Sequence, residues 1–433
     1  MNGADLLASL PDGWRRVPLK ATADFAVSNV DKHSFDDELP VRLCNYTDVY
    51  KNDRVSPDMD LMAATATPQE IERFHLEVGD VVITKDSESW NDIAIPAYVE
   101  GTADDFVCGY HLAFIRPRKD VLDGRFLLRC LQSRPVALQL ELEATGVTRY
   151  GLPKDAVGLA VLPLPPLPTQ HRIAHYLDRE TARIDGLIAE KERMLALLEE
   201  KRAALISRVV TRGLDPNAPL KPSGQEWLGE IPAHWDEPRA KGLFREVDRR
   251  TETGEETLLS LRMGKGLVPH NDVSEKLLES SDIAGFKKIE PGQMVINRMR
   301  AASGLIAVAT EPGLVSPDYA VFDVVDQDLS IEYFLELFKT SLLQAVFRSS
   351  SKGLGTGEQG FLRLYTDAFL SLHFPYPPID EQHAIATFID QQRSEMLQME
   401  TLLRRSIFLA KERRAALITA AVTGQIPLKE MAR

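Results

Sequence analysis

The chain has 433 residues, of which 44% are hydrophobic and 27% are charged. This length is too great for one ordinary core and predicts two or more domains, and the composition is that of a folded protein, which excludes a largely disordered chain. The 51 Lys and Arg residues against 64 Asp and Glu residues give a net charge of −13, which excludes a basic surface over the whole molecule.

Three further features bear on the compartment. No apolar run approaches the roughly 20 residues that span a bilayer, and the N-terminal stretch does not look like a secretory signal. The three cysteines (Cys44, Cys108 and Cys130) are widely spaced and form no Cys-x-x-Cys pair. This pattern argues against a zinc framework or a disulfide scaffold and fits a reducing cytoplasm, so we expect a cytoplasmic protein.

Residues 1–165 form the first mixed segment, with 17 Lys and Arg against 26 Asp and Glu. Short runs rich in β-branched and aromatic residues, bounded by turn formers, predict strands at 79–84 and 110–117. A helix is predicted at 125–133. This mixture of strands and helices is typical of an α+β domain.

Residues 166–215 follow a proline-rich hinge and predict a long helix, with Thr169 as the candidate N-cap. Apolar residues recur with heptad spacing along two seams. One seam is Leu177, Ile184, Lys191, Leu198 and Leu205, and the other is Thr181, Ile188, Leu195, Arg202 and Val209.

Residues 216–378 repeat the mixed pattern, with strands predicted at 293–299 and 319–325 and helical structure at 331–347. They carry 17 Lys and Arg against 23 Asp and Glu. Residues 379–433 then predict a second long helix, with Asp380 as the candidate N-cap. Its seams are Ile389, Met396, Leu403, Ala410 and Leu417, and Arg393, Glu400, Ile407, Arg414 and Ala421.

The chain contains an internal repeat with a displacement of 212 residues. LPLPPLPTQHRIAHYLD (162–178) reappears as FPYPPIDEQHAIATFID (374–390), and eight of the 16 aligned pairs from Pro163/Pro375 to Asp178/Asp390 are identical. KRAALISRVVT (201–211) likewise matches RRAALITAAVT (413–423), and LPDGW (10–14) and LEVGDVVITK (76–85) have weaker counterparts in IPAHW (231–235) and IEPGQMVINR (289–298). A repeat of this length predicts two whole domains, each followed by a helix.

Two arrangements of these helices are open. Each helix could pack on its own domain, as amphipathic helices commonly do. About 40 residues at 1.5 Å each give a rod of ~60 Å, which is too long for one small domain. We therefore expect an α+β protein whose two globular domains are joined by two long helices in an antiparallel coiled coil, with a pseudo-two-fold internal repeat.

The ordered motifs resemble those of the DNA-specificity subunits of type I restriction-modification enzymes. The resemblance rests on ITKDSESWNDIAIPAYV (83–99), both hinges, KRAALI and RRAALI, INRMRAASGLIAVAT (296–310), GLVSPDYAVFDV (313–324) and the linker PSGQEWLGEIPAHW (222–235). It implies that 1–165 and 216–378 are target-recognition domains, each reading one half of a split asymmetric DNA site. It also implies that 166–215 and 379–433 are spacer regions that set the separation and bind two methyltransferase subunits.

The same resemblance implies a non-catalytic protein of phage defence. The adenine methyltransferase signature is absent from the sequence, since LPPL (164–167) and YPPI (376–379) lack its polar first residue, and no phosphate-binding Gly-x-x-x-x-Gly-Lys-Ser/Thr occurs. No cofactor or metal is expected in this chain. The partners are expected to use S-adenosylmethionine, together with ATP and Mg if two restriction subunits join the complex, and no membrane is expected as a partner.

Candidate DNA contacts lie in basic, glycine-rich loops at equivalent places in both domains, because loops on a rigid scaffold carry recognition. They lie just after the repeated strand and just before the hinge. The candidates are Lys85, Ser87, Trp90, Arg149, Tyr150 and Lys154 in the first domain and Asn297, Arg298, Arg300, Lys352, Gln359 and Arg363 in the second. The alternative is a two-headed coiled-coil adaptor that binds proteins and no DNA, which would suit the acidic composition.

Overall fold

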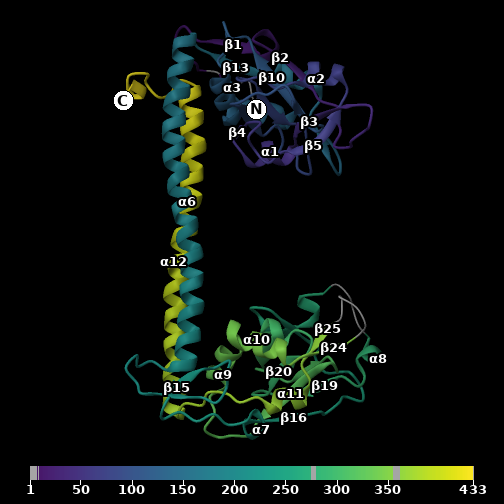
Figure 1. The fold of residues 1–433 in the computed structure, drawn as a ribbon, viewed down its shortest axis with the longest axis vertical. Helices are drawn as coiled ribbons and strands as arrows, with labels where there is room; N and C mark the ends of the chain where they lie inside the picture. Colours follow the sequence, from purple (N-terminus) through teal and green to yellow (C-terminus); the bar gives the residue numbers. More distant parts are fainter. Residues whose placement is uncertain (1–6, 8, 275–278, 355–360, 433) are drawn as a thin grey trace. The chain divides into compact units, whose positions relative to one another are not determined.

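The computed structural model describes residues 7, 9–274, 279–354 and 361–432. The chain divides into two compact units, Met1–Glu192 with Arg404–Arg433 as unit 1 and Arg193–Leu403 as unit 2. Two long helices, α6 (Leu167–Arg212) and α12 (Ile379–Val422), each contribute one segment to each unit (Figure 1). The part of unit 1 that precedes α6, up to residue 166, is called the first head. Residues 213–378, which lie between α6 and α12 in unit 2, are called the second head.

The first head is a mixed α+β domain, as the sequence predicts. Its helices are α1 (Tyr46–Lys51), α2 (Pro68–Phe74), α3 (Gly124–Gln132), α4 (Arg134–Leu142) and α5 (Lys154–Leu159). Its strands are β1 (Arg15–Pro18), β2 (Ala23–Val27), β3 (Leu39–Cys44), β4 (Arg54–Val55), β5 (Met62–Ala66), β6 (Val81–Thr84), β7 (Asp86–Ser87), β8 (Pro96–Val99), β9 (Phe106–Cys108), β10 (Leu112–Pro117), β11 (Thr145–Gly146), β12 (Tyr150–Gly151) and β13 (Val161–Leu164). The central sheet has the order β2-β10-β6-β8-β4, beside smaller sheets β5-β3-β9, β11-β12-β7 and β1-β13.

The second head repeats this plan. Its helices are α7 (Ala240–Leu243), α8 (Ser280–Ile283), α9 (Ile331–Phe338), α10 (Ser341–Ser349) and α11 (Thr366–Ser371). Its strands are β14 (Leu220–Pro222), β15 (Glu230–Pro232), β16 (Phe244–Val247), β17 (Leu259–Arg262), β18 (Gly266–Pro269), β19 (Lys287–Ile289), β20 (Met294–Asn297), β21 (Ile306–Val308), β22 (Gly313–Val315), β23 (Tyr319–Val324), β24 (Lys352–Leu354) and β25 (Phe361–Arg363). The sheet order β16-β23-β20-β21 matches β2-β10-β6-β8 of the first head.

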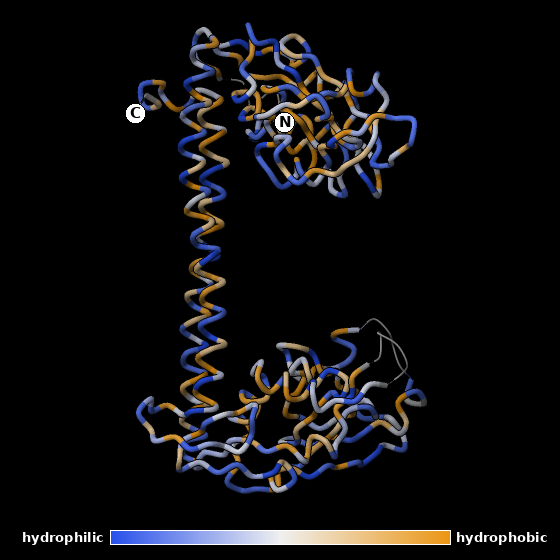
Figure 2. The backbone as a smooth tube through the Cα atoms, viewed as in Figure 1, coloured by the Kyte–Doolittle hydropathy of each residue, from blue (hydrophilic) through white to orange (hydrophobic). Residues whose placement is uncertain are grey.

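The two long helices pack against each other along the predicted seams. Every seam position is buried or half-buried, and the polar positions between the seams are mostly exposed. Figure 2 shows apolar and polar residues interspersed along both helices. The buried seam residues are Leu177, Thr181, Ile184, Ile188 and Val209 in α6 and Ile389, Met396, Ile407 and Ala421 in α12.

Contacts within each unit show that the helix segments are antiparallel. In unit 1, Arg414 of α12 contacts Asp185 of α6, whereas the earlier Lys411 contacts the later Glu192. In unit 2, Val209 and Val210 near the end of α6 share a hydrophobic core with the start of α12. The alternative in which each helix packs only on its own domain is therefore wrong.

Among the described residues, no helix combines the length and the apolar character needed to cross a membrane.

The predicted N-caps are wrong by a few residues. The helices begin at Leu167 and Ile379, ahead of Thr169 and Asp380, so both candidate caps lie inside the first turn. The reason is the hinge prolines: proline lacks an N–H group and its ring fixes φ near the helical value, so it suits the start of a helix without a side-chain cap.

A buried glutamine ties each long helix to its head. Gln170 Oε1 accepts a hydrogen bond from the N–H of Asp123 (2.9 Å), and its Nε2 donates to the carbonyls of Val121 (2.9 Å) and Pro165 (2.9 Å). Because Asp123 caps α3, the glutamine fixes α3 against the start of α6.

The second copy of this glutamine is Gln382, which makes the same three bonds. Its Oε1 accepts from the N–H of Ser330 (2.8 Å), and its Nε2 donates to the carbonyls of Asp328 (3.1 Å) and Pro377 (2.9 Å). Both glutamine side chains are fully buried. The glutamine that is repeated in the two hinges thus has a structural role.

Each long helix ends at a glycine with positive φ that lies against a tryptophan. Gly213 (φ +75°) ends α6, and Gly424 (φ +73°) follows α12. A Cβ atom on Gly213 would lie 3.3 Å from the ring of Trp235, and one on Gly424 would lie 3.4 Å from the ring of Trp14 and 2.3 Å from Pro11. The weak repeat of LPDGW and IPAHW therefore marks two equivalent helix ends.

Candidate nucleic-acid interface

In the first head, a small sheet joins two predicted loops into one surface. The chain leaves the central strand β6 at Thr84 and forms β7, which pairs with β12 so that Ser87 lies opposite Tyr150. The N–H of Leu152 donates to the carbonyl of Lys85 (2.8 Å). The candidate segments 85–90 and 145–154 are thus brought together at the edge where β6 ends.

A polar cluster lies on this surface. His111 Nδ1 is 2.5 Å from the carboxylate of Asp86, and Lys85 Nζ is 3.6 Å from the same carboxylate. Arg149 Nη2 lies 3.5 Å from His111 Nδ1. His111 has φ +73°, an uncommon conformation for a residue with a side chain, and the ordered contacts around it hold it there.

Aromatic side chains surround the polar cluster. The Tyr110 ring lies 4.0 Å from the His111 ring and 5.5 Å from Lys85 Nζ. On α1, Tyr46 and Tyr50 stack with their centroids 5.5 Å apart, and the Tyr50 hydroxyl donates to Asp92 (2.8 Å). Burial raises the pKa of Tyr46 and the charge of Asp92 adds to this effect, whereas a hydrogen bond with Ser87 acts in the opposite direction.

The six predicted residues of the first head differ in how they are presented. Trp90 and Arg149 are exposed in loops, and Lys154 is exposed at the start of α5. Lys85 and Tyr150 are half-buried. Ser87 is only 7% exposed and its hydroxyl accepts from the N–H of Ser89 (3.2 Å), so it shapes the loop from inside.

The second head uses the same backbone connection at the same edge. The N–H of Leu364 donates to the carbonyl of Arg298 (2.9 Å), which is the counterpart of the bond from Leu152 to Lys85. Strands β24 and β25 pair so that Lys352 lies opposite Arg363. The loop after β20 and the segment before the hinge therefore meet here too.

The side chains of this second surface divide into exposed cations and structural groups. Lys352 and Arg300 are exposed, and Arg363 Nη1 pairs with Asp318 (3.0 Å). Arg298 points inward, where it pairs with Glu246 and donates to the Thr366 hydroxyl (2.9 Å).

Asn297 also has an internal role, because its Oδ1 accepts from the N–H groups of Met299 (3.1 Å) and Arg300 (3.3 Å) and so shapes the turn. The remaining candidate, Gln359, lies outside the described residues.

Sequence reasoning missed several residues on these surfaces. His111 and Asp86 lie beside the predicted Lys85, and Tyr46 is linked to the cluster through Ser87 and Arg149. In the second head, Tyr319 is influenced by the positive charges of Arg262 and Arg300, and burial raises the pKa of its phenol. The register of the predicted strands was the available signal, since His111 precedes Leu112, which pairs with Thr84.

A second type of surface lies on the long helices. Eight large apolar side chains there are exposed by 47% or more, although isolated helix surfaces in water usually carry polar residues. They are Leu187, Met194 and Leu197 on α6 and Leu397, Met399, Leu402, Phe408 and Leu409 on α12. Two pairs, Leu187 with Met399 and Leu197 with Leu409, are related by the 212-residue repeat.

Comparison with known proteins identifies the fold. No protein-family model matches the sequence, and no curated protein matches it. A chain from a structure on complex assembly and conformational transition of the type I R-M system aligns with 96% of this chain and 100% of its own length, at 16% identity and a TM-score of 0.69. The HsdS subunit from Thermoanaerobacter tengcongensis aligns over 96% and 98%, at 17% identity and a TM-score of 0.55.

A third structure, the S subunit of the type I restriction-modification system from M. genitalium, aligns over 95% and 97% at 13% identity, with a TM-score of 0.35. The first two alignments span nearly the whole chain in both directions. This chain therefore has the fold of a type I specificity subunit, and the fold implied by the sequence resemblance is confirmed.

Proposed function

We propose that this protein is the DNA-specificity subunit of a type I restriction-modification complex and acts in the cytoplasm without catalysing a reaction itself. In this proposal the domains are residues 1–165 and 216–378, and each reads one half of a split asymmetric site. The helical regions 166–215 and 379–433 fix the separation and bind two methyltransferase subunits, which bring the S-adenosylmethionine. If two restriction subunits join the same complex, they bring the ATP and Mg.

The repeated edge of the central sheet is the observation that carries the proposal. The same backbone bond, from Leu152 to Lys85 and from Leu364 to Arg298, supports a surface loop in each head. The exposed side chains on these two scaffolds differ, with Trp90 and Arg149 on one and Lys352 and Arg300 on the other. A common scaffold with different side chains is what two readers of different half-sites require.

The net charge of −13 would by itself disfavour the binding of DNA, but the acidic groups beside the candidate loops are paired within the protein. Asp86 is paired with His111 and Lys85, and Asp92 accepts from Tyr50, so these acidic groups beside the loops are already engaged. Arginine suits bidentate contacts with guanine, while exposed aromatic rings suit stacking on bases or sugars.

The exposed apolar residues of the long helices support a protein partner on that surface. Because Leu187/Met399 and Leu197/Leu409 are repeat-related, they fit two copies of one partner better than two unrelated partners. The adaptor alternative, in which the heads bind proteins instead of DNA, explains these helix residues equally well. The two functions differ only in what the heads bind.

Binding of the reconstituted complex to DNA at several salt concentrations separates the two functions. Phosphate contacts release counterions, so DNA recognition predicts a steep fall in affinity as salt increases. An adaptor without DNA recognition predicts neither sequence preference nor this salt dependence, and that result would contradict the proposal.

A matched pair of arginine variants tests the first head. Arg149→Ala is expected to weaken binding to the first half-site by ~1–3 kcal/mol if the side chain reads a base. Arg118→Ala is the control, because Arg118 is also exposed but follows the opposite end of β10 from His111 and pairs with Asp24. Filter binding with full-length DNA sites measures the affinity of both variants. If Arg149→Ala binds as tightly as Arg118→Ala, the proposed role of Arg149 is wrong.

A further inference from the structure

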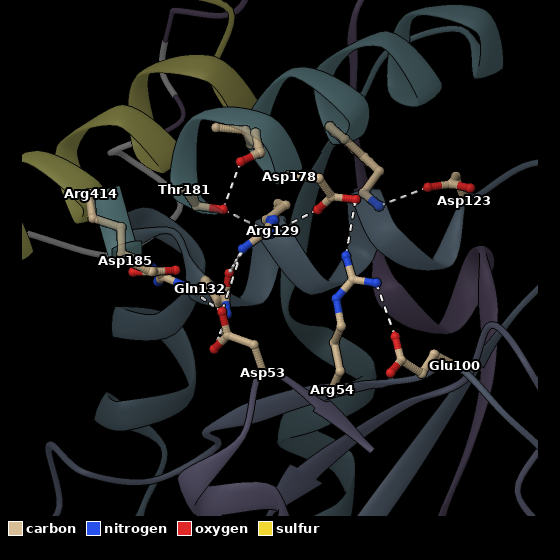
Figure 3. A network of polar contacts seen from close by, with 12 residues as sticks. Asp53, Arg54, Glu100, Asp123, Arg129, Gln132, Asp178, Thr181, Asp185 and Arg414 are labelled. Carbon is tan, nitrogen blue, oxygen red and sulfur yellow. Dashed lines mark hydrogen bonds and ion pairs between the residues drawn. The ribbon is translucent and has the colours of Figure 1, made fainter. Parts of the chain in front are cut away.

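An ion-pair network connects the C-terminal helix to the first head. Arg414 of α12 pairs with Asp53 of the head, and its Nε lies 2.8 Å from the carboxylate of Asp185 on α6. Only 21% of the Arg414 side chain is exposed. Figure 3 shows this guanidinium where the head and both helix segments of unit 1 meet.

The network continues from Asp53 into the head. The Asp53 carboxylate accepts from Gln132 Nε2 (3.1 Å) and lies 3.7 Å from Arg129 Nη1. Arg129 is only 3% exposed, and its Nη2 donates to Asp178 (2.8 Å) and Thr181 (3.2 Å) of α6 (Figure 3). Together with Arg414 and Asp185, seven charged or polar groups from four separate parts of the chain thus hold one another in place.

Apolar contacts between a head and the end of the other long helix occur in both units. Ile418, Ala421 and Val422 of α12 belong to the core of the first head, and Val209 and Val210 of α6 belong to that of the second. Such contacts are favourable but not directional, because the hydrophobic effect depends on buried area. Ion pairs with fixed donors add an orientation that the apolar contacts do not impose.

Among the described residues of unit 2, the repeat-related positions do not form the equivalent network. The repeat counterpart of Arg414 is Arg202, which among the described residues pairs with Glu199 of its own helix (2.9 Å), and the counterpart of Asp185 is Leu397. The second head is instead tied to α12 by Glu336, which pairs with Arg393 (2.5 Å).

The charges at this second junction are also reversed. A buried arginine of the first head meets Asp178, whereas a carboxylate of the second head meets an arginine one helical turn beyond the equivalent Asp390. The two heads therefore do not share one mode of electrostatic attachment.

We propose that Arg414 is a positioning residue for the first head, and that its pairs with Asp53 and Asp185 fix the orientation in which that head presents its DNA-reading surface. This inference rests on the proposed function. It assigns the accuracy of first half-site recognition in part to the C-terminal helix, 361 residues away from Asp53 in sequence. The second head has no such dependence on α6.

The test compares matched arginine variants in the complete complex with its methyltransferase subunits. Methylation is measured on duplexes with the natural spacer between half-sites and on duplexes whose spacer is one base pair longer. Arg414→Met is expected to lower the preference for the natural spacer about fivefold, the size expected for loss of a partly exposed ion pair. Arg202→Met, the repeat-related control, is expected to leave that preference unchanged.

Two further variants separate positioning from general damage. Arg414→Lys retains the charge and should recover most of the preference, and Asp53→Asn should reproduce Arg414→Met without adding to it in the double variant. A purely structural role predicts a lower melting temperature and less total methylation at an unchanged spacer preference, and that result would overturn the inference. So would equal preferences for Arg414→Met and Arg202→Met.

The proposed function itself fails differently. If the wild-type complex methylates no split site, the function is wrong whatever Arg414 does. If the wild type discriminates spacers and the Arg414 variants match it, only the positioning role is wrong.

Discussion

The duplicated glutamine clamp makes the sharpest prediction about stability. In Gln170→Met the side chain keeps its approximate size but loses its hydrogen-bonding groups. The N–H of Asp123 and the carbonyls of Val121 and Pro165 then lose a partner inside the protein. A buried group left without a hydrogen bond costs about 1–3 kcal/mol, and the carbonyls lie at the low end, so we expect a loss of about 3 kcal/mol in unit 1.

Hydrogen exchange resolved by segment is the appropriate assay, because the two units need not unfold together. A loss of about 3 kcal/mol corresponds to roughly a hundredfold faster exchange of the α3 amides. Gln382→Met should produce the same change in α9 and leave α3 protected. Arg172→Ala, an exposed substitution two residues after Gln170, is the control. Unchanged α3 exchange in Gln170→Met, or equal loosening of both units, would refute this account of the clamp.

Two further predictions concern the helices. Leu197→Glu and Leu409→Glu each place a charge at one of two repeat-related exposed apolar positions. Each single variant is expected to remove one methyltransferase subunit from the complex, and the double variant to remove both, as counted by native mass spectrometry. An intact complex in the double variant would contradict docking at these positions. Gly424→Ala should destabilise unit 1 by about 2 kcal/mol or more, because φ at this position is positive and the added Cβ atom would lie too close to Pro11. Gly186→Ala, in open space on α6, should stabilise unit 1 by about 0.5–1 kcal/mol. If thermal unfolding ranks the two variants in the opposite order, the end of α12 adapts to the added side chain.

Much of the fold was predictable because its signals are local. The heptad spacing identified Ile184, Ile188, Ile389 and Ile407 as seam residues, and all four are buried. The central strands follow from short β-branched runs such as VVIT, which forms β6. The repeat supplied the rest, because a displacement of 212 residues predicts two copies of one architecture.

The functional surfaces were predictable only as segments. Both candidate loops of the first head were identified, but their union through Tyr150 and Ser87 depends on strand pairing across 63 residues of sequence. The chemistry of single side chains was not predictable, since Arg298 is turned inward by Glu246 and Thr366. An arginine in a loop has the same sequence signature whether it faces solvent or an internal carboxylate.

The ion-pair network had no signal in the sequence. The contact between Asp53 and Arg414 spans 361 residues, and the repeat suggests the opposite of what is found, because Arg202 and Arg414 occupy equivalent positions but have different partners. Repeats predict shared backbone structure, and the differences between copies become visible only when partners from distant segments are in place.

Single-molecule methylome sequencing of a host that expresses this chain with the proposed methyltransferase partner tests the central claim most directly. Two different heads held by the paired helices predict methylated adenines in one split, asymmetric motif with a fixed unread spacer. Replacing residues 216–378 by the head of another specificity subunit should change only one half of that motif. A contiguous motif, no motif, or a change in both halves would contradict the reading of DNA by two separate heads.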